Sequence, residues 1–135
     1  MKWDEQAQRL RRKAAIDEQA MIILIGDSSS ADEVVGFHAQ QAVEKLLKAA
    51  LSHRRVAFQK THDLVQLFNL LNANGITAPH EVTESRRLGP YAVAFRYEDI
   101  SDAGAPVLDR TWVAQRVQRT REWVDALFAG GSKSP

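Results

Sequence analysis

The polar residues on one predicted helix give the sequence its most specific chemistry. Four of them recur at intervals of three, four and three residues: His38, Gln41, Lys45 and Lys48. On a helix these four positions form one stripe, and its imidazole, amide and ammonium groups can hold an anion such as a phosphate. Charged stripes are also common on ordinary solvated helices, where Glu44 and Lys48 would form a weak local ion pair.

Two residues from other parts of the chain extend this candidate site. His62 lies in the phrase Thr61-His62-Asp63-Leu64, and Arg96 is followed by Tyr97. An arginine can bind a phosphate through two parallel hydrogen bonds. We therefore predict a nucleotide- or phosphate-binding site made of the stripe, His62 and Arg96. The alternative is that His62 only begins a helix and that Arg96 only caps one.

Asp17 interrupts the apolar row of the first predicted helix. A carboxylate on a buried face must be paired, because an isolated buried charge is strongly destabilising. His38, Lys45 and Arg96 are the candidate partners. Such a pair would be consistent with a purely structural role or with a small polar pocket.

The elements that position these residues are all helical. Apolar residues recur every three or four positions, and no segment alternates with period two for long enough to form a strand. We predict helices over residues 3–25, 31–52, 61–72, 77–95 with an interruption at Pro90, and 109–129. Ser30 with Glu33 is predicted to form a capping box at the second helix, and Thr61 to be the N-cap of the third. The fold class is all-α, an antiparallel four-helix bundle with one additional short helix.

Length and composition limit the other possibilities. With 135 residues the chain suits one domain, which we place at residues 1–129, followed by a disordered tail at 130–135. A net charge of +1 gives no general case for nucleic-acid binding, and the absence of cysteine excludes disulfides and thiolate zinc sites. His53 and His80 lack ligand spacing, so we predict no metal and no cofactor. No apolar run is long enough for a membrane span, and we expect a cytoplasmic protein.

The phrase at residues 37–49, together with Thr61-His62-Asp63-Leu64 and Arg96-Tyr97, resembles the HEPN domain family over most of the chain. The resemblance implies a four- or five-helix bundle that often forms a homodimer. It also implies a frequent partner, a minimal nucleotidyltransferase-domain protein, with which such domains form toxin and antitoxin pairs. Many members are ribonucleases, and these carry an Arg-x4–6-His motif near the start of the last long helix.

This chain departs from the ribonuclease pattern. No histidine follows His80, so neither Arg96 nor Arg110 can be the arginine of this motif. The single match to its spacing in the sequence is Arg55 with His62. We therefore predict a non-catalytic module that binds a nucleotide, an RNA or a nucleotidyltransferase partner. The alternative is an RNA-cleaving toxin that uses His62 with Arg55 or Arg96. A purely structural dimer is the third interpretation.

Overall fold

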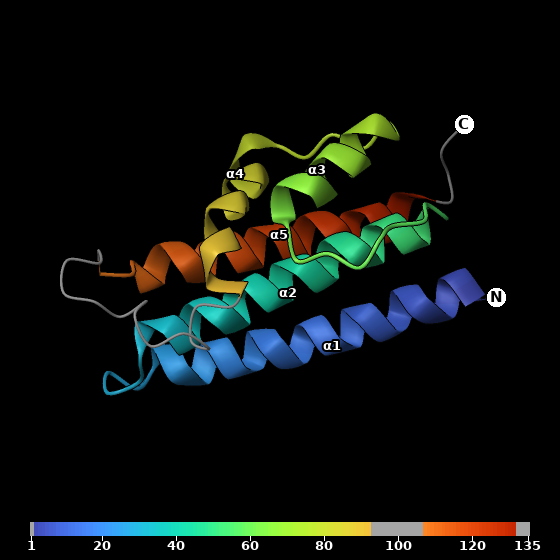
Figure 1. Ribbon diagram of the computed structural model, residues 1–135. Coiled ribbons are helices and arrows are strands. Elements are labelled where there is room, and N and C mark those ends of the chain that lie inside the picture. The colour runs from blue at the N-terminus through green and yellow to red at the C-terminus, as the bar shows by residue number, and fades with distance from the viewer. Residues whose placement is uncertain (1, 93–106, 132–135) are drawn as a thin grey trace.

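The computed structural model describes residues 2–92 and 107–131, and every element in them is a helix (Figure 1). The elements are α1 (Lys2–Ile25), α2 (Asp32–His53), α3 (Leu64–Ala73), α4 (His80–Thr83), the 3₁₀-helix η1 (Glu84–Ala92) and α5 (Arg110–Gly131). The prediction of an all-α bundle is confirmed. Arg96, the end of the fourth predicted helix and residues 132–135 of the predicted tail lie outside the described residues.

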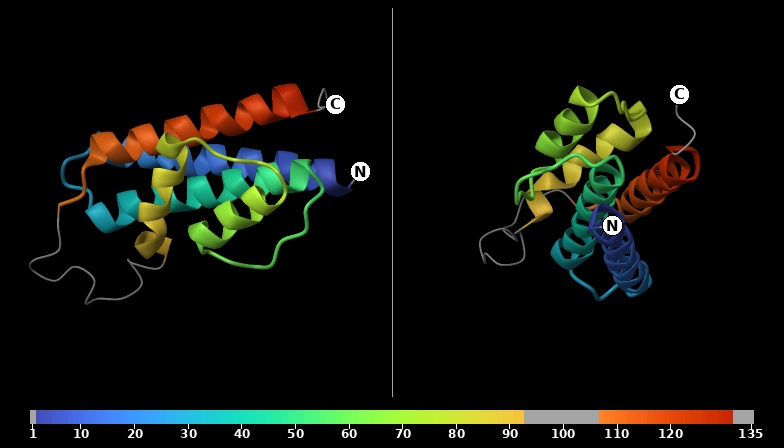
Figure 2. Two further views of the ribbon diagram at one scale, coloured as in Figure 1. Left: turned by 90° about the horizontal axis from the view of Figure 1, so that it is seen from above. Right: turned by 90° about the vertical axis from the view of Figure 1, so that its right-hand side faces the viewer.

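Helix α2 is the centre of the bundle. It packs against α1, α3, η1 and α5, and thirteen of its 22 residues are buried. Figure 2 shows α1 and α5 along α2, and α3 with η1 on its other side. Helix α1 buries a single face, at Ala7, Ala14, Asp17 and Met21, as expected of an amphipathic outer helix. The polar stripe therefore lies on the most enclosed helix of the fold.

The long helices run in two directions. Helices α1 and α2 form an antiparallel pair joined by a short loop, whereas α5 runs parallel to α2 (Figure 1). The contacts agree with this direction, because Arg110 pairs with Asp32 at the two helix starts and Phe128 stacks on His53 at the two ends. The chain between α2 and α5 contains α3, α4 and η1 and returns to the end of the molecule where α2 began.

The predicted capping box at α2 is wrong. The N-cap is Ala31, which makes no side-chain cap bond. The hydroxyl of Ser30 lies 2.6 Å from the carbonyl oxygen of Leu24 and accepts a hydrogen bond from Arg110 at 3.0 Å. These partners from α1 and α5 engage the hydroxyl that a capping box would need, so the start of α2 is stabilised by tertiary contacts.

The predicted N-cap of the third helix is also wrong, by two residues. Asp63 caps α3, since its Oδ1 atom accepts from the backbone N–H groups of Val65 at 3.0 Å and Gln66 at 3.3 Å. Thr61 instead accepts a hydrogen bond from the backbone N–H of Asp63 at 3.0 Å. The threonine thus orders the turn that places His62, and the aspartate begins the helix.

The fourth predicted helix is divided. Helix α4 has only four residues and continues directly into η1, which contains Pro90. The α-helix ends at Thr83 and η1 continues through Pro90 to Ala92, so the interruption predicted at Pro90 lies earlier in the chain than expected. Helix α5 extends to Gly131, two residues past the predicted end.

Gly36 allows η1 to lie against α2. A Cβ atom at this position would be 2.3 Å from Cδ1 and 2.5 Å from Cγ of Tyr91. To make room, the Tyr91 ring would have to leave its packed position or η1 would have to move away from α2. We expect Gly36→Ala to lower the free energy of unfolding by about 2 kcal/mol through overpacking, measured by urea denaturation. Gly130→Ala is the control, because a Cβ atom there meets nothing within 4 Å; equal stability of the two variants would contradict the prediction.

Candidate functional site

The first polar cluster joins α1 to α2 through Asp17. Its two carboxylate oxygens lie 3.0 Å from Nδ1 of His38 and 2.5 Å from Nζ of Lys45. Asp17 is only 8% exposed. The prediction that this carboxylate is paired is therefore confirmed, and the partners are His38 and Lys45. We call these three residues the Asp17 centre.

The second cluster surrounds Glu44, which is buried on the side of α2 that faces the segment before α3. Its contacts include Lys48 Nζ at 2.9 Å, His62 Nδ1 at 3.0 Å and Gln40 Nε2 at 3.0 Å. Gln41 donates to the Oε1 atom of Gln40 at 2.8 Å. Gln40, Gln41, Glu44, Lys48 and His62 together form what we call the Glu44 centre.

His62 is held at two points while its ring stays in contact with solvent. Glu44 lies at Nδ1, and Gln40 donates from Nε2 to the backbone carbonyl of His62 at 3.1 Å. The side chain of His62 is 63% exposed. With an ionised carboxylate at Nδ1, the hydrogen-bond network assigns the proton to that nitrogen, so Nε2 is the atom that can accept a proton or contact a ligand.

The charge of Glu44 is set by opposing effects. Burial by itself raises the pKa of this carboxyl, but hydrogen bonds from Lys48, Gln40 and His62 outweigh it and hold the pKa below its ordinary value. Glu44 is consequently ionised at neutral pH. An ionised carboxylate accepts hydrogen bonds only, which fixes the orientation of the three donors around it.

The structure thus divides the predicted stripe between two carboxylates. His38 and Lys45 meet at Asp17, whereas Gln41 and Lys48 meet His62 at Glu44. Both lysines are ion-paired, so their charge is already compensated. An anion would therefore have to be bound by the partly exposed atoms of the Glu44 centre.

Arg55 and His62 are not brought together. The segment after α2 folds back along that helix (Figure 1) and returns His62 to Glu44. Arg55 stays beyond the end of α2, with a positive φ of 61° and a guanidinium nitrogen 4.0 Å from Asp4. Glu44, which holds His62, lies nine residues before the end of α2, or about 13 Å along the helix axis. His62 and Arg55 are therefore placed at different positions along α2. Arg96, the other predicted partner of His62, lies outside the described residues.

Two residues of the Glu44 centre were missed by the sequence prediction. Gln40 was not a candidate, although it is fully buried, and Glu44 was expected only beside the stripe. Their sequence signal is a polar pair four residues apart among Ala39, Val43 and Leu47, the apolar positions of the helix. Polar groups on an interior face need partners there, and these two provide the partners that hold His62.

Comparisons with known proteins give one match. The sequence model of the HEPN domain matches residues 7–127. No curated protein and no solved structure matches the chain. Within residues 2–92 and 107–131 there is no group of three metal-binding side chains, and no helix there is long and apolar enough to cross a bilayer.

The Asp17 centre gives a prediction for stability. Removing Asp17 leaves Lys45 half-buried without its partner, so we expect Asp17→Asn to cost about 2 kcal/mol, between the values for exposed and buried ion pairs. A double-mutant cycle with Lys45→Met should give a coupling energy of about 1 kcal/mol or more. The control is a second cycle on the exposed pair of Asp4 and Arg55, which lie 4.0 Å apart. For this pair we expect a coupling energy below about 0.5 kcal/mol. Similar coupling in both cycles would contradict the assignment.

The Glu44 centre gives a prediction for pH dependence. Since the pKa of Glu44 is lower in the folded chain than its ordinary value of 4.5, the unfolded chain binds more protons in acid. The stabilisation from Glu44 is complete above this ordinary value and is lost as the pH falls toward the folded-state pKa. We expect the free energy of unfolding of Glu44→Gln to decrease less between about pH 5 and about pH 3 than that of the parent chain. The exposed Glu122→Gln should retain the parent's slope, and identical slopes in all three proteins would refute the prediction.

Proposed function

We propose that this chain, which belongs to the HEPN domain family, is a non-catalytic module that binds a phosphate group of a nucleotide or an RNA at the Glu44 centre. The observation that carries the proposal is the exposed imidazole of His62, held by Glu44 at Nδ1 and by Gln40 at its carbonyl. A ligand contact needs a group that is both accessible and fixed in orientation. Among the predicted site residues that the structure describes, His62 has the most exposed side chain.

The charges around His62 favour an anionic ligand. Lys48 balances Glu44, to which it is bonded at 2.9 Å. With a proton on both ring nitrogens of His62, the centre has two cations and one carboxylate. The protonated ring then donates a charge-assisted hydrogen bond to the ligand, which is stronger than a neutral one.

The family also supports a proposal about partners. We propose that the chain forms a homodimer and acts in the cytoplasm with a nucleotidyltransferase-domain protein, as half of a toxin and antitoxin pair. This part rests on family membership. It is tested by co-expression with the protein encoded by the neighbouring gene, followed by affinity purification and determination of the mass of the complex.

RNA cleavage is the second candidate function, and one observation favours it. A buried carboxylate that orients a histidine through Nδ1 leaves Nε2 able to act as a general base. Metal-free cleavage also needs a cation to stabilise the charge that develops on the phosphate. Arg55 is directed toward Asp4, and Lys48 is engaged by Glu44. The described residues therefore support binding better than catalysis.

Binding is tested by calorimetric titration with a short polyuridine RNA and, separately, with inorganic phosphate. His62→Gln retains a polar side chain but cannot gain a proton, so we expect its affinity for the RNA to fall about tenfold, or about 1.4 kcal/mol. His80→Gln is the matched control, because the His80 ring is also exposed and also lies near a glutamate, 3.5 Å from Glu84. Unchanged affinity in His62→Gln, or no binding by the parent chain, would refute the proposal.

The same proteins distinguish the two functions. If the parent chain and His80→Gln cleave the RNA while His62→Gln leaves it intact, the module is a ribonuclease. If the parent chain binds the RNA and the RNA stays intact with all three proteins, the non-catalytic assignment holds.

A further inference from the structure

The outer face of α1 has a basic half and an apolar half along one line. Its residues recur at helical spacing, on the side opposite the buried positions of the helix: Arg9, Arg12, Lys13, Ile16 and Ile23. In Figure 1 and Figure 2, α1 lies at the edge of the bundle, and no other helix covers its outer side. We call these five residues the α1 ridge, which spans about 21 Å along the helix axis.

The apolar half of the α1 ridge is widely exposed. Ile16 is 65% exposed and Ile23 is 66% exposed, and Ile22 on the adjoining flank is 57% exposed. Among the residues that the structure describes, five large hydrophobic residues are exposed, and these three lie on one helix. A single exposed hydrophobic residue is ordinary, whereas several close together indicate an interaction surface.

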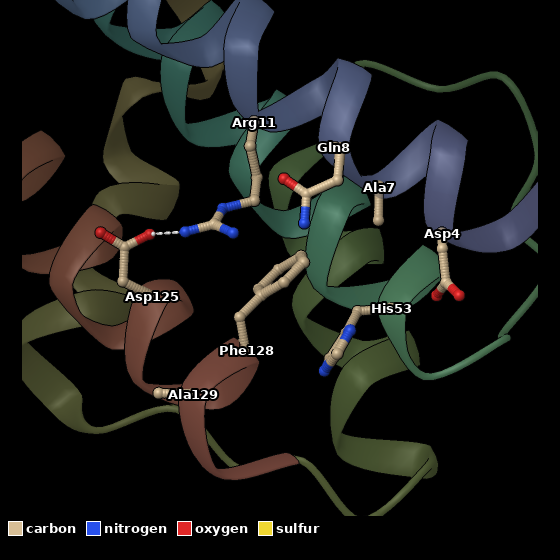
Figure 3. Close-up of a pocket in the computed structure, with 8 residues that line it drawn as sticks. All are labelled: Asp4, Ala7, Gln8, Arg11, His53, Asp125, Phe128 and Ala129. Carbon is tan, nitrogen blue, oxygen red and sulfur yellow. Dashed lines mark hydrogen bonds and ion pairs between the residues drawn. The ribbon is translucent and has the colours of Figure 1, made fainter. Parts of the chain in front are cut away.

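The basic half of the α1 ridge has no internal partner in residues 2–92 and 107–131. Arg9, Arg12 and Lys13 are exposed and make no hydrogen bond or ion pair with these parts of the chain. The neighbouring flank of α1 is different, as Figure 3 shows: Arg11 is directed toward Asp125, to which it is bonded at 2.8 Å. The charge on that flank is compensated, and the charge on the α1 ridge is not.

The carboxylates of α1 do not neutralise this charge. Three of the four lie within 4.0 Å of a cation on another element or segment: Asp4, Asp17 and Glu18. By its spacing from Arg9 and Arg12, Glu5 alone shares the outer side of the helix. The α1 ridge therefore has three cations against one carboxylate, and it is complementary to an anionic partner.

A second copy of this chain is not complementary to the α1 ridge. If two ridges met in parallel about a two-fold axis, each cation would face its own equivalent. If they met antiparallel about Ile16, Arg9 would face Ile23, seven residues away on either side. In both arrangements the cations would remain uncompensated.

The shape of the α1 ridge favours a bilayer over an acidic protein. A contact limited to one helix face of this length covers about 200 Å² on each partner, whereas specific protein interfaces bury about 1,000 Å² or more in total. A bilayer needs no matching surface. Isoleucine side chains enter the boundary between headgroups and acyl chains, and arginine and lysine side chains attract anionic headgroups.

We propose that the α1 ridge binds the surface of a membrane that is rich in anionic phospholipid. Helix α1 lies parallel to the bilayer plane, with Ile16 and Ile23 in the boundary region. Arg9, Arg12 and Lys13 pair with the lipid phosphates. The contact is made at the surface and needs no helix that crosses the bilayer. The inference goes beyond the proposed function, because it involves no residue of the Glu44 centre.

The test is co-sedimentation of the full chain with vesicles of phosphatidylcholine that contain about 30% phosphatidylglycerol, and with vesicles of phosphatidylcholine alone. We expect binding to the anionic vesicles to be about tenfold tighter or more, and to be lost when the salt concentration rises from about 0.1 M to about 0.5 M. The double variants Ile16→Gln with Ile23→Gln, and Arg9→Gln with Arg12→Gln, should each weaken binding about tenfold.

Matched controls remove the same kinds of side chain from other surfaces. Val65→Gln changes an apolar residue of α3 that is 45% exposed, and Arg86→Gln with Arg119→Gln removes two arginines whose side chains are about half exposed. Both controls should bind the anionic vesicles as the parent chain does. His62→Gln should also bind them normally, so failure of RNA binding and failure of membrane binding are distinguishable. Circular dichroism shows whether each variant keeps the parent's helix content.

Several results would overturn the proposal. These are no sedimentation with anionic vesicles, equal binding to neutral vesicles, or unchanged binding in both ridge variants. Binding of a polyglutamate peptide without binding of vesicles would assign the cations to an acidic protein segment. A parent dimer that the Ile16 and Ile23 variant converts to a monomer in sedimentation equilibrium would assign the α1 ridge to a second copy.

Discussion

The arrangement of the molecule depends on one constraint: helix α2 is enclosed by its neighbours and still carries ionisable side chains. An enclosed charge must be paired, because the loss of hydration is otherwise not recovered. Each neighbour of α2 on the polar side supplies such a partner. Helix α1 provides Asp17 for Lys45, and the segment before α3 brings His62 to Glu44. The same contacts that stabilise the bundle therefore determine which functional groups reach its surface.

The sequence predicted a large part of this arrangement. Spacing alone placed His38, Gln41, Lys45 and Lys48 on one helix, and the apolar row around Asp17 predicted a paired carboxylate. It could not predict that the stripe is shared between two carboxylates. That division depends on which neighbour covers each side of α2, which is a property of the tertiary structure. Gln40 was missed for the same reason, since its role appears only when the carbonyl of His62 lies beside it.

The errors have a related cause. Ser30 has the sequence pattern of an N-cap, but its hydroxyl contacts Leu24 and Arg110, and a local pattern carries no information about a residue 80 positions away. Arg55 and His62 have the spacing of a family motif, but the reversal of the chain after α2 separates them. Helix positions are largely set by local periodicity. Caps, helix direction and the composition of a site depend on contacts between distant segments.

Arg110 shows what this dependence means for the folding of the chain. Its guanidinium donates to the carbonyl oxygens of Leu24, Asp27 and Ser30 and to the carboxylate of Asp32, so it closes the loop between α1 and α2. From within the loop, the hydroxyl of Ser30 bonds two of the same carbonyls, those of Leu24 and Asp27. Arg110 adds bonds to this loop from α5, so docking of α5 also orders the connection between α1 and α2. Ordering of the loop and docking of α5 are therefore coupled, although Ser30 and Arg110 lie 80 positions apart.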